Sequence, residues 1–260
     1  MEFIDWESTP VILGPGPYGK TILEGYPSWD GFMTGGLLKA LKKSRRTSVY
    51  LWQGGGRAFI LKYYKTLPVP AWWPWLHGRP KRVWPMGVAL EISGVPVPAN
   101  AALVRPSSGV TVIILEYLHE AATLHAFVTA GKANERHFAG LGRLTGRLHR
   151  SGVVHGDLKW SNIMVCNPDV RDAPGFCLID LDGASWLRGK GDDAAARSRD
   201  IARFICDGIK ERIENDFLMA FRQGYHELWP VDSDFEKAVD NRLKRLLKRK
   251  KIPCNSISRR

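Results

Sequence analysis

His155-Gly156-Asp157-Leu158-Lys159-Trp160-Ser161-Asn162 is the stretch that decides the fold of this 260-residue chain. It places the carboxylate of Asp157 and the amide of Asn162 on one short polar segment. A second carboxylate, Asp180, follows the short apolar run Cys177–Ile179. Oxygen ligands of this kind suit Mg²⁺, and a carboxylate held beside them can accept the proton of a hydroxyl group. The pattern therefore predicts a catalytic loop built around a hard metal ion.

The sequence on either side predicts the local structure that such a loop needs. Before the loop, apolar residues recur at helical spacing: Phe138, Leu141, Leu144 and Leu148. The pair Ser151-Gly152 is expected to end that helix. Val153-Val154 predicts a short buried strand that leads into the loop. Ile163–Val165 predicts a strand that leaves it, and Phe176–Ile179 is expected to pair back as a hairpin. This order of elements favours a catalytic loop over an ordinary polar loop.

The segment resembles the catalytic loop of the protein-kinase superfamily. The resemblance implies that Asp157 is the base for an acceptor hydroxyl and that Asn162 and Asp180 are the Mg²⁺ ligands. It also implies that Lys159 is directed at the γ-phosphate of ATP, where an ammonium group offsets developing charge. The alternative for Lys159 is a solvated surface lysine.

Three neighbouring residues add detail to this resemblance. Gly156 stands where regulated protein kinases carry arginine, and residues 183–199 contain no Ala-Pro-Glu segment. Both absences favour a small-molecule or glycan acceptor over a protein acceptor. His155 is expected to shape the loop by hydrogen bonding, and Asp182 is either a further metal ligand or a group that fixes the turn.

The N-terminal half predicts a strand hairpin that carries a lysine. Ser48–Gln53 and Arg57–Tyr64 are β-rich runs separated by three glycines. Lys62 in the second run resembles the strand lysine that holds the α- and β-phosphates of ATP in kinases. The alternative is an exposed lysine at a strand end. Leu37–Lys42 is the expected preceding strand, and Ser44–Thr47 is the expected loop over the nucleotide, although it has no glycine.

Two further residue groups resemble the nucleotide contacts of kinases. Val112–Leu115 is a continuous apolar run, which predicts a central buried strand. The residues after it resemble a kinase hinge, in which the carbonyl of Glu116 and the amide of Leu118 would contact adenine; the alternative is a core strand that ends in a turn. Kinases also pair the strand lysine with a helix glutamate, and Glu91 is the only candidate in the helix expected before Gly94, a helix that Pro85 and Gly87 weaken; the alternative is that Lys62 is held by another group.

Over residues 37–225 the chain resembles the bacterial lipopolysaccharide core kinases, which phosphorylate Kdo or heptose of the inner core. The segments that carry this resemblance are Lys42–Tyr50, Ile60–Lys62, Lys81–Trp84, Gly94–Pro98, His155–Asn162, Leu178–Asp182 and Arg199–Arg203. It implies an ATP- and Mg²⁺-dependent sugar kinase. It also implies a two-lobed α+β, protein-kinase-like fold, with a small antiparallel-sheet N-lobe at residues 1–118 and a mainly helical C-lobe at residues 119–260.

Two other functions remain open. Small atypical kinases of the tRNA-modification complex also combine a His-Gly-Asp loop with a basic tail, but their characteristic acidic segment after the metal aspartate is missing here. A non-catalytic kinase-fold binding protein is the third possibility. The joint presence of four residues counts against it: Lys62, Asp157, Asn162 and Asp180.

The net charge of +12 is concentrated at the C-terminus, where residues 242–260 contain nine Lys or Arg and no acidic residue. Apolar residues fall beside these charges on one helical face: Phe235, Val239, Leu243, Leu246 and Leu247. The helix either packs on the C-lobe or attracts anionic lipid or glycolipid at the inner leaflet. The tryptophan-rich segment Pro70–His77 either covers the N-lobe core or lies at the membrane interface. No nucleic acid partner is expected, although charge alone does not choose among polyanions.

The remaining composition predicts a cytoplasmic protein, with peripheral attachment to the inner membrane as an option. The four cysteines show neither metal-ligand nor disulfide spacing, which fits a reducing compartment. The first residues lack the basic and apolar regions of a signal peptide. No apolar run approaches the length of a membrane span.

Overall fold

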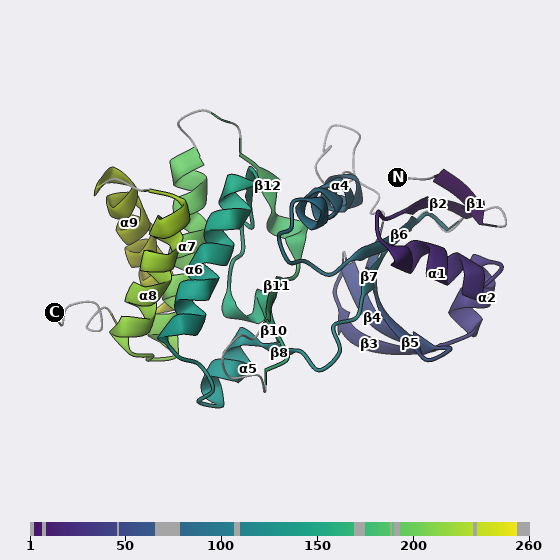
Figure 1. The fold of residues 1–260 in the computed structure, drawn as a ribbon, viewed down its shortest axis with the longest axis horizontal. Helices are drawn as coiled ribbons and strands as arrows, with labels where there is room; N and C mark the ends of the chain where they lie inside the picture. The colour runs from purple at the N-terminus through teal and green to yellow at the C-terminus, as the bar shows by residue number, and fades with distance from the viewer. Residues whose placement is uncertain are drawn as a thin grey trace. The chain divides into compact units, whose positions relative to one another are not determined.

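The computed structural model describes residues 3–6, 9–45, 47–65, 79–106, 110–168, 175–187, 189, 193–230 and 233–253. The chain divides into two compact units, Met1–His119 and Glu120–Arg260 (Figure 1). An antiparallel sheet dominates the first unit and helices dominate the second, as the sequence predicts. The tryptophan-rich segment Pro70–His77 lies outside the described residues.

The described strands of the first unit form one antiparallel sheet in the order β1-β2-β6-β7-β5-β4-β3. They are β1 (Phe3–Trp6), β2 (Thr9–Leu13), β3 (Leu37–Lys43), β4 (Thr47–Gly54), β5 (Arg57–Tyr64), β6 (Asn100–Val104) and β7 (Thr111–Glu116). The predicted hairpin is β4–β5, and the predicted strand before it is β3. The apolar run Val112–Ile114 is buried at the centre of the sheet, which confirms the central strand expected there.

A layer of two helices, α1 (Pro17–Gly25) and α2 (Trp29–Thr34), covers one face of this sheet (Figure 1). Aromatic rings make up much of the interface. Phe32 of α2 stacks on Trp52 of β4 at a centroid distance of 4.3 Å, and the indole N–H of Trp52 donates to the carbonyl of Phe32 at 2.9 Å. Both side chains are fully buried, so this layer extends the core of the unit.

The helix expected before Gly94 is α4 (Arg79–Ile92), which packs against β6 and β7. The helix continues through Pro85, because burial of its apolar residues outweighs the low helix propensity of proline. These buried residues are Val83, Trp84, Met86, Val88 and Leu90. Gly94 has a φ of +69° and ends the helix. The amide of Val95 donates to the carbonyl of Leu90 at 3.0 Å, which completes a glycine-dependent C-terminal cap.

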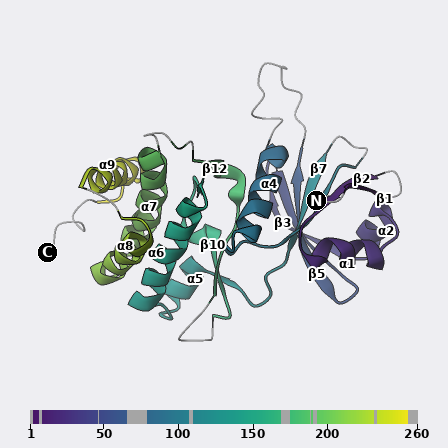
Figure 2. The same ribbon diagram turned by 45° about the horizontal axis from the view of Figure 1, so that its top comes forward.

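The second unit combines short strands with two pairs of packed helices. Its elements are β8 (Ala122–Thr123), α5 (Leu124–Thr129), α6 (Glu135–Arg150), β9 (Val153–Val154), η1 (Trp160–Asn162), β10 (Ile163–Cys166), β11 (Gly175–Leu178), η2 (Leu181–Gly183), β12 (Ser185–Trp186), α7 (Asp193–Lys210), α8 (Asn215–Leu228) and α9 (Ser233–Lys250). Helix α6 packs on α8, and α7 packs on α9 (Figure 2). The helix, the entering strand and the β10–β11 hairpin around residues 155–162 confirm the predicted local order.

The basic helix α9 uses its apolar face inside the second unit. Phe235, Val239, Leu243 and Leu247 are buried, and the helix packs on α7. Its exposed face carries the charges of Lys244, Arg245 and Lys248. The apolar face of α9 therefore packs on the C-terminal unit and does not contact lipid. The charged face remains available for other contacts.

No helix in the described part of the chain combines the length and the apolar character needed to span a bilayer. Within the same residues Cys166, Cys177 and Cys206 form no disulfide.

Candidate active site

The loop from His155 to Asn162 alternates between residues that anchor it and residues that project from it. Leu158 and Trp160 are buried, and the Trp160 ring packs 5.6 Å from Phe138 and 5.8 Å from Phe204, measured between centroids. The side chains that alternate with them, Asp157 and Lys159, remain about one third exposed, at 31% and 35%. The apolar anchors therefore fix the positions from which the two polar groups reach solvent.

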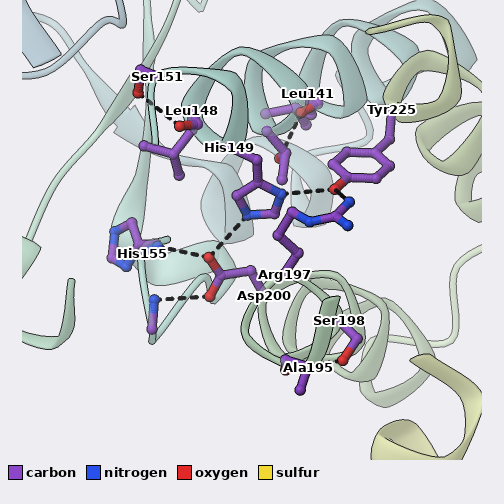
Figure 3. Close-up of polar contacts among 12 residues, drawn as sticks. Leu141, Leu148, His149, Ser151, His155, Ala195, Arg197, Ser198, Asp200 and Tyr225 are labelled. Carbon is purple, nitrogen blue, oxygen red and sulfur yellow. Dashed lines mark hydrogen bonds and ion pairs between the residues drawn. The ribbon is translucent and has the colours of Figure 1, made fainter. Parts of the chain in front are cut away.

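A buried carboxylate, Asp200 of α7, holds the start of the loop (Figure 3). Its Oδ2 accepts the backbone N–H of His155 at 2.7 Å, and its Oδ1 accepts that of Gly156 at 2.8 Å. The ring of His155 contacts the carbonyl of Ile179 at 3.0 Å, in agreement with its predicted hydrogen-bonding role. Asp200 was not among the predicted site residues, although it lies in Arg199–Arg203, one of the segments that carry the family resemblance.

Asp200 belongs to a buried chain of hydrogen bonds that continues through His149 and Tyr225 to Arg197 (Figure 3). His149 Nε2 lies 3.3 Å from Asp200 Oδ2, and His149 Nδ1 lies 2.8 Å from the hydroxyl of Tyr225. Burial lowers the pKa of His149, which favours a neutral ring that donates through Nε2 to the carboxylate of Asp200. Nδ1 then accepts from Tyr225, whose pKa burial raises to about 12, and Arg197 donates to the same hydroxyl at 3.2 Å. Both ring nitrogens of His149 and the hydroxyl of Tyr225 are therefore paired, whereas the Nε of Arg197 is buried without a hydrogen-bond partner among the described residues.

Gly156 explains in steric terms why no arginine occupies this position. Its φ is +76°, in the left-handed region that favours glycine. A Cβ atom here would overlap the carbonyl oxygen of Gly183, which belongs to the turn after Asp180. The close approach of these two backbone segments requires a residue without a side chain.

The predicted base, Asp157, lies between two cationic groups. Lys159 Nζ is 3.1 Å from its Oδ2, and Arg203 of α7 forms an ion pair with its Oδ1. The amide nitrogen of Asn162 donates to the backbone carbonyl of Asp157 at 3.0 Å and lies 3.4 Å from Oδ2. The predicted residues Asp157, Lys159 and Asn162 are thus brought together, whereas Arg203 was not assigned a role from the sequence.

The two predicted metal ligands sit at the end of the β10–β11 hairpin. The carbonyl of Asn162 accepts the N–H of Ile179 at 2.9 Å, next to Asp180. Because the amide nitrogen of Asn162 points to Asp157, its amide oxygen is left for another partner. No group of three or more His, Cys, Asp or Glu side chains suited to a metal occurs among the described residues. One carboxylate and one amide oxygen still fit Mg²⁺, which takes its other ligands from phosphates and water.

In the first unit, Lys62 lies on β5 with 8% of its surface exposed and its Nζ 5.7 Å from the centre of the Tyr64 ring. The carboxylate of Glu91 accepts the backbone N–H of Asn100 at 3.1 Å. The pairing of Lys62 with Glu91 remains a prediction.

The predicted hinge begins at the end of β7, where Glu116 is held by two donors. The hydroxyl of Tyr18 donates to its Oε1 at 2.8 Å, and the backbone N–H of Ala99 donates to its Oε2 at 3.2 Å. The hydrogen bond to Glu116, followed by burial, raises the pKa of Tyr18 to about 12. Sequence reasoning missed Tyr18, which is far from Glu116 in the chain. The adenine contacts of the Glu116 carbonyl and the Leu118 amide remain predictions.

Comparisons with known proteins match this arrangement. A model of the lipopolysaccharide kinase (Kdo/WaaP) family matches residues 88–221. Proteins named 3-deoxy-D-manno-octulosonic acid kinase from Xylella fastidiosa strains 9a5c and M12 are 27% identical to this chain over 210 residues, which is 79% of this chain and 68% of each relative.

Two solved structures share the fold. One is titled "WaaP in complex with acyl carrier protein", with a TM-score of 0.66 and 15% identity over 91% of this chain and 98% of that one. The other is a microcompartment-associated aminopropanol kinase, with a TM-score of 0.55 and 16% identity over 88% of this chain and 86% of that one. These matches confirm the predicted two-lobed α+β, kinase-like fold.

Proposed function

The chain belongs to the lipopolysaccharide kinase (Kdo/WaaP) family, and from this premise we propose that it phosphorylates a Kdo or heptose hydroxyl of the lipopolysaccharide inner core. Its family and its kinase relatives make it an ATP-dependent kinase. The observation that carries the proposal is the placement of Asp157 beside Lys159 and Asn162, on a loop fixed by Asp200. The name of the sequence relatives favours Kdo over heptose.

The proposed roles follow from the chemistry of each group. Asp157 orients the acceptor hydroxyl and accepts its proton, while the ammonium group of Lys159 offsets charge on the transferred phosphoryl group. Asn162 and Asp180 hold Mg²⁺, which neutralises the phosphate oxygens of ATP when it is bound. Positioning and charge neutralisation account for most of the catalysis in phosphoryl transfer.

The first unit supplies the proposed nucleotide contacts. Lys62 binds the α- and β-phosphates of ATP, and Glu91 orients Lys62. The Glu116 carbonyl and the Leu118 amide bind the adenine edge. Tyr18 and Ala99 donate to the two carboxylate oxygens of Glu116, so the contact with adenine is proposed for the backbone and not for this side chain.

The direct test is phosphate transfer from ATP to purified core glycolipids that end in Kdo or in heptose, with the phosphate located by mass spectrometry. We expect one phosphate on a sugar hydroxyl. Turnover of ATP with amino alcohols or proteins as the only phosphorylated acceptors would instead indicate a kinase with another substrate class.

Asp180→Ala is expected to abolish the stabilisation of the protein by Mg²⁺-ATP, because the metal loses its carboxylate ligand. At one hundred times the dissociation constant, wild-type protein gains about 2.7 kcal/mol. Asp182→Ala is the matched control and should keep the gain. Thermal melting with and without Mg²⁺-ATP measures both variants. A gain that survives in Asp180→Ala and disappears in Asp182→Ala would reverse the assignment of the two carboxylates.

We also propose that the enzyme works at the cytoplasmic face of the inner membrane, attached through α9 and the tryptophan-rich segment Pro70–His77. Since the apolar face of α9 is buried, the attachment by this helix is electrostatic and uses Lys244, Arg245 and Lys248. Each such charge near an anionic surface contributes about 1 kcal/mol.

Replacement of these three residues by glutamine should weaken binding to anionic vesicles by roughly 3 kcal/mol at low salt. Lys250 is left intact because its Nζ lies 3.1 Å from Asp207, whose other oxygen accepts the N–H of Trp160 in the catalytic loop. The control replaces three exposed basic residues elsewhere: Lys20, Arg136 and Arg147. Co-sedimentation measures binding at two salt concentrations. Equal losses in both triple variants, or wild-type binding that ignores salt, would contradict electrostatic attachment by α9.

A further inference from the structure

Arg203 reaches the proposed base from a different element than the catalytic loop. It lies on α7, one turn after Asp200. Because Asp200 binds two successive N–H groups of the loop, α7 is fixed against that loop. Arg203 is therefore held beside Asp157, with its Nη2 paired to Oδ1.

The contact with Asp157 uses only part of the hydrogen-bonding capacity of Arg203. A guanidinium group carries five N–H donors in a planar fork. Its Nε is buried and has no hydrogen-bond partner among the described residues. The side chain as a whole is 24% exposed. The buried Nε is out of reach of a solute, so an anionic group that arrives beside Asp157 would be bound by the partly exposed remainder of the guanidinium group.

Two cations, Lys159 and Arg203, contact the single carboxylate of Asp157. In the proposed mechanism Lys159 acts on the transferred phosphate, and Arg203 has no assigned role. A neutral sugar brings no charge to this site, whereas a sugar acid brings a carboxylate that matches the geometry of a guanidinium fork.

We propose that Arg203 is a specificity-determining residue that binds the carboxylate of an acidic sugar acceptor and thereby places the hydroxyl at Asp157. This inference rests on the proposed function and narrows its acceptor to a sugar acid. The competing explanation is that Arg203 only positions Asp157. In that case its loss lowers turnover for all acceptors alike, so the two explanations differ in the selectivity of the variant enzyme and not merely in its rate.

The test compares kcat/KM for a soluble 3-deoxy-D-manno-octulosonic acid glycoside with that for its methyl ester, which lacks the negative charge. Wild-type enzyme should prefer the acid by roughly 10- to 100-fold, the range of a charge-assisted hydrogen bond. Arg203→Gln should reduce the preference to about threefold or less, and Arg203→Lys should fall between the two, because it keeps the charge and loses the fork. Arg199→Gln, an exposed position one turn earlier on α7, should keep the wild-type preference.

Each outcome decides between the explanations. An unchanged acid-to-ester ratio in Arg203→Gln, whatever its rate, would overturn the inference and leave the proposed sugar kinase intact. An equal rate for acid and ester in the wild type would also overturn it. If wild-type enzyme phosphorylates neutral heptose and no sugar acid, the Kdo assignment fails together with the inference. If Arg203→Gln does not fold in thermal melting, the wild-type and Arg203→Lys ratios still decide.

Discussion

Asp157→Asn is expected to lower the rate of phosphoryl transfer by roughly 10²-fold or more, because asparagine cannot accept the proton of the acceptor hydroxyl. Binding of ATP should stay close to the wild-type value, since no nucleotide contact is assigned to Asp157. The substitution keeps the shape of the side chain, and Asn162 still donates to the backbone carbonyl at position 157. The effect should therefore be confined to turnover.

Steady-state turnover with the glycolipid acceptor and equilibrium binding of ATP together measure this prediction. Asp216→Asn is the control for loss of a carboxylate, because Asp216 is exposed in the first turn of α8. Turnover of Asp157→Asn within a few fold of wild type would remove Asp157 from the role of base.

Asp200→Asn is expected to have the largest effect on stability. The carboxylate of Asp200 is fully buried and accepts from His155 N–H, Gly156 N–H and the ring of His149. An asparagine amide group would direct its own N–H groups at one of these donors. The buried donor left without an acceptor, together with the lost charge-assisted bonds, should cost about 3 kcal/mol.

A loss of this size lowers the melting temperature by roughly 6–12 °C for a chain of this length. Asp216→Asn again serves as control and should change stability by less than about 0.5 kcal/mol. Activity measured below the melting transition should also fall, because the backbone that carries Asp157 is no longer held. A melting temperature and a turnover that both match wild type would show that Asp200 does not anchor the loop.

Several parts of this architecture follow from local sequence alone. The spacing of Phe138, Leu141, Leu144 and Leu148 specifies one buried face of α6, and each of these residues is almost fully buried. Alternation of anchors and polar groups in the loop, and the β10–β11 hairpin after it, are likewise encoded within a few residues. Periodicity of side chains is a local property of helices and strands, so such elements can be read directly from the chain.

The periodicity of side chains does not predict the charged groups that surround Asp157. Arg203 and Asp200 meet the catalytic loop only because α7 returns to it, and the hydrogen bond from His155 to Asp200 joins residues 45 positions apart. The bond between Tyr18 and Glu116 spans 98 positions. The spacing of these residues along the chain does not reveal the contacts, although Arg199–Arg203 is one of the segments that carry the family resemblance.

The helix α9 shows the same division between sequence and tertiary structure. Its amphipathic pattern determined that a basic helix with one apolar face would form. The pattern did not determine what the apolar face would contact, because burial against protein and burial in lipid are favoured by the same hydrophobic effect. Packing on α7 decided this question. Likewise, the sequence shows a glycine at position 156 but not why it is required. In the folded chain the carbonyl of Gly183 lies too close to position 156 for any side chain to fit there.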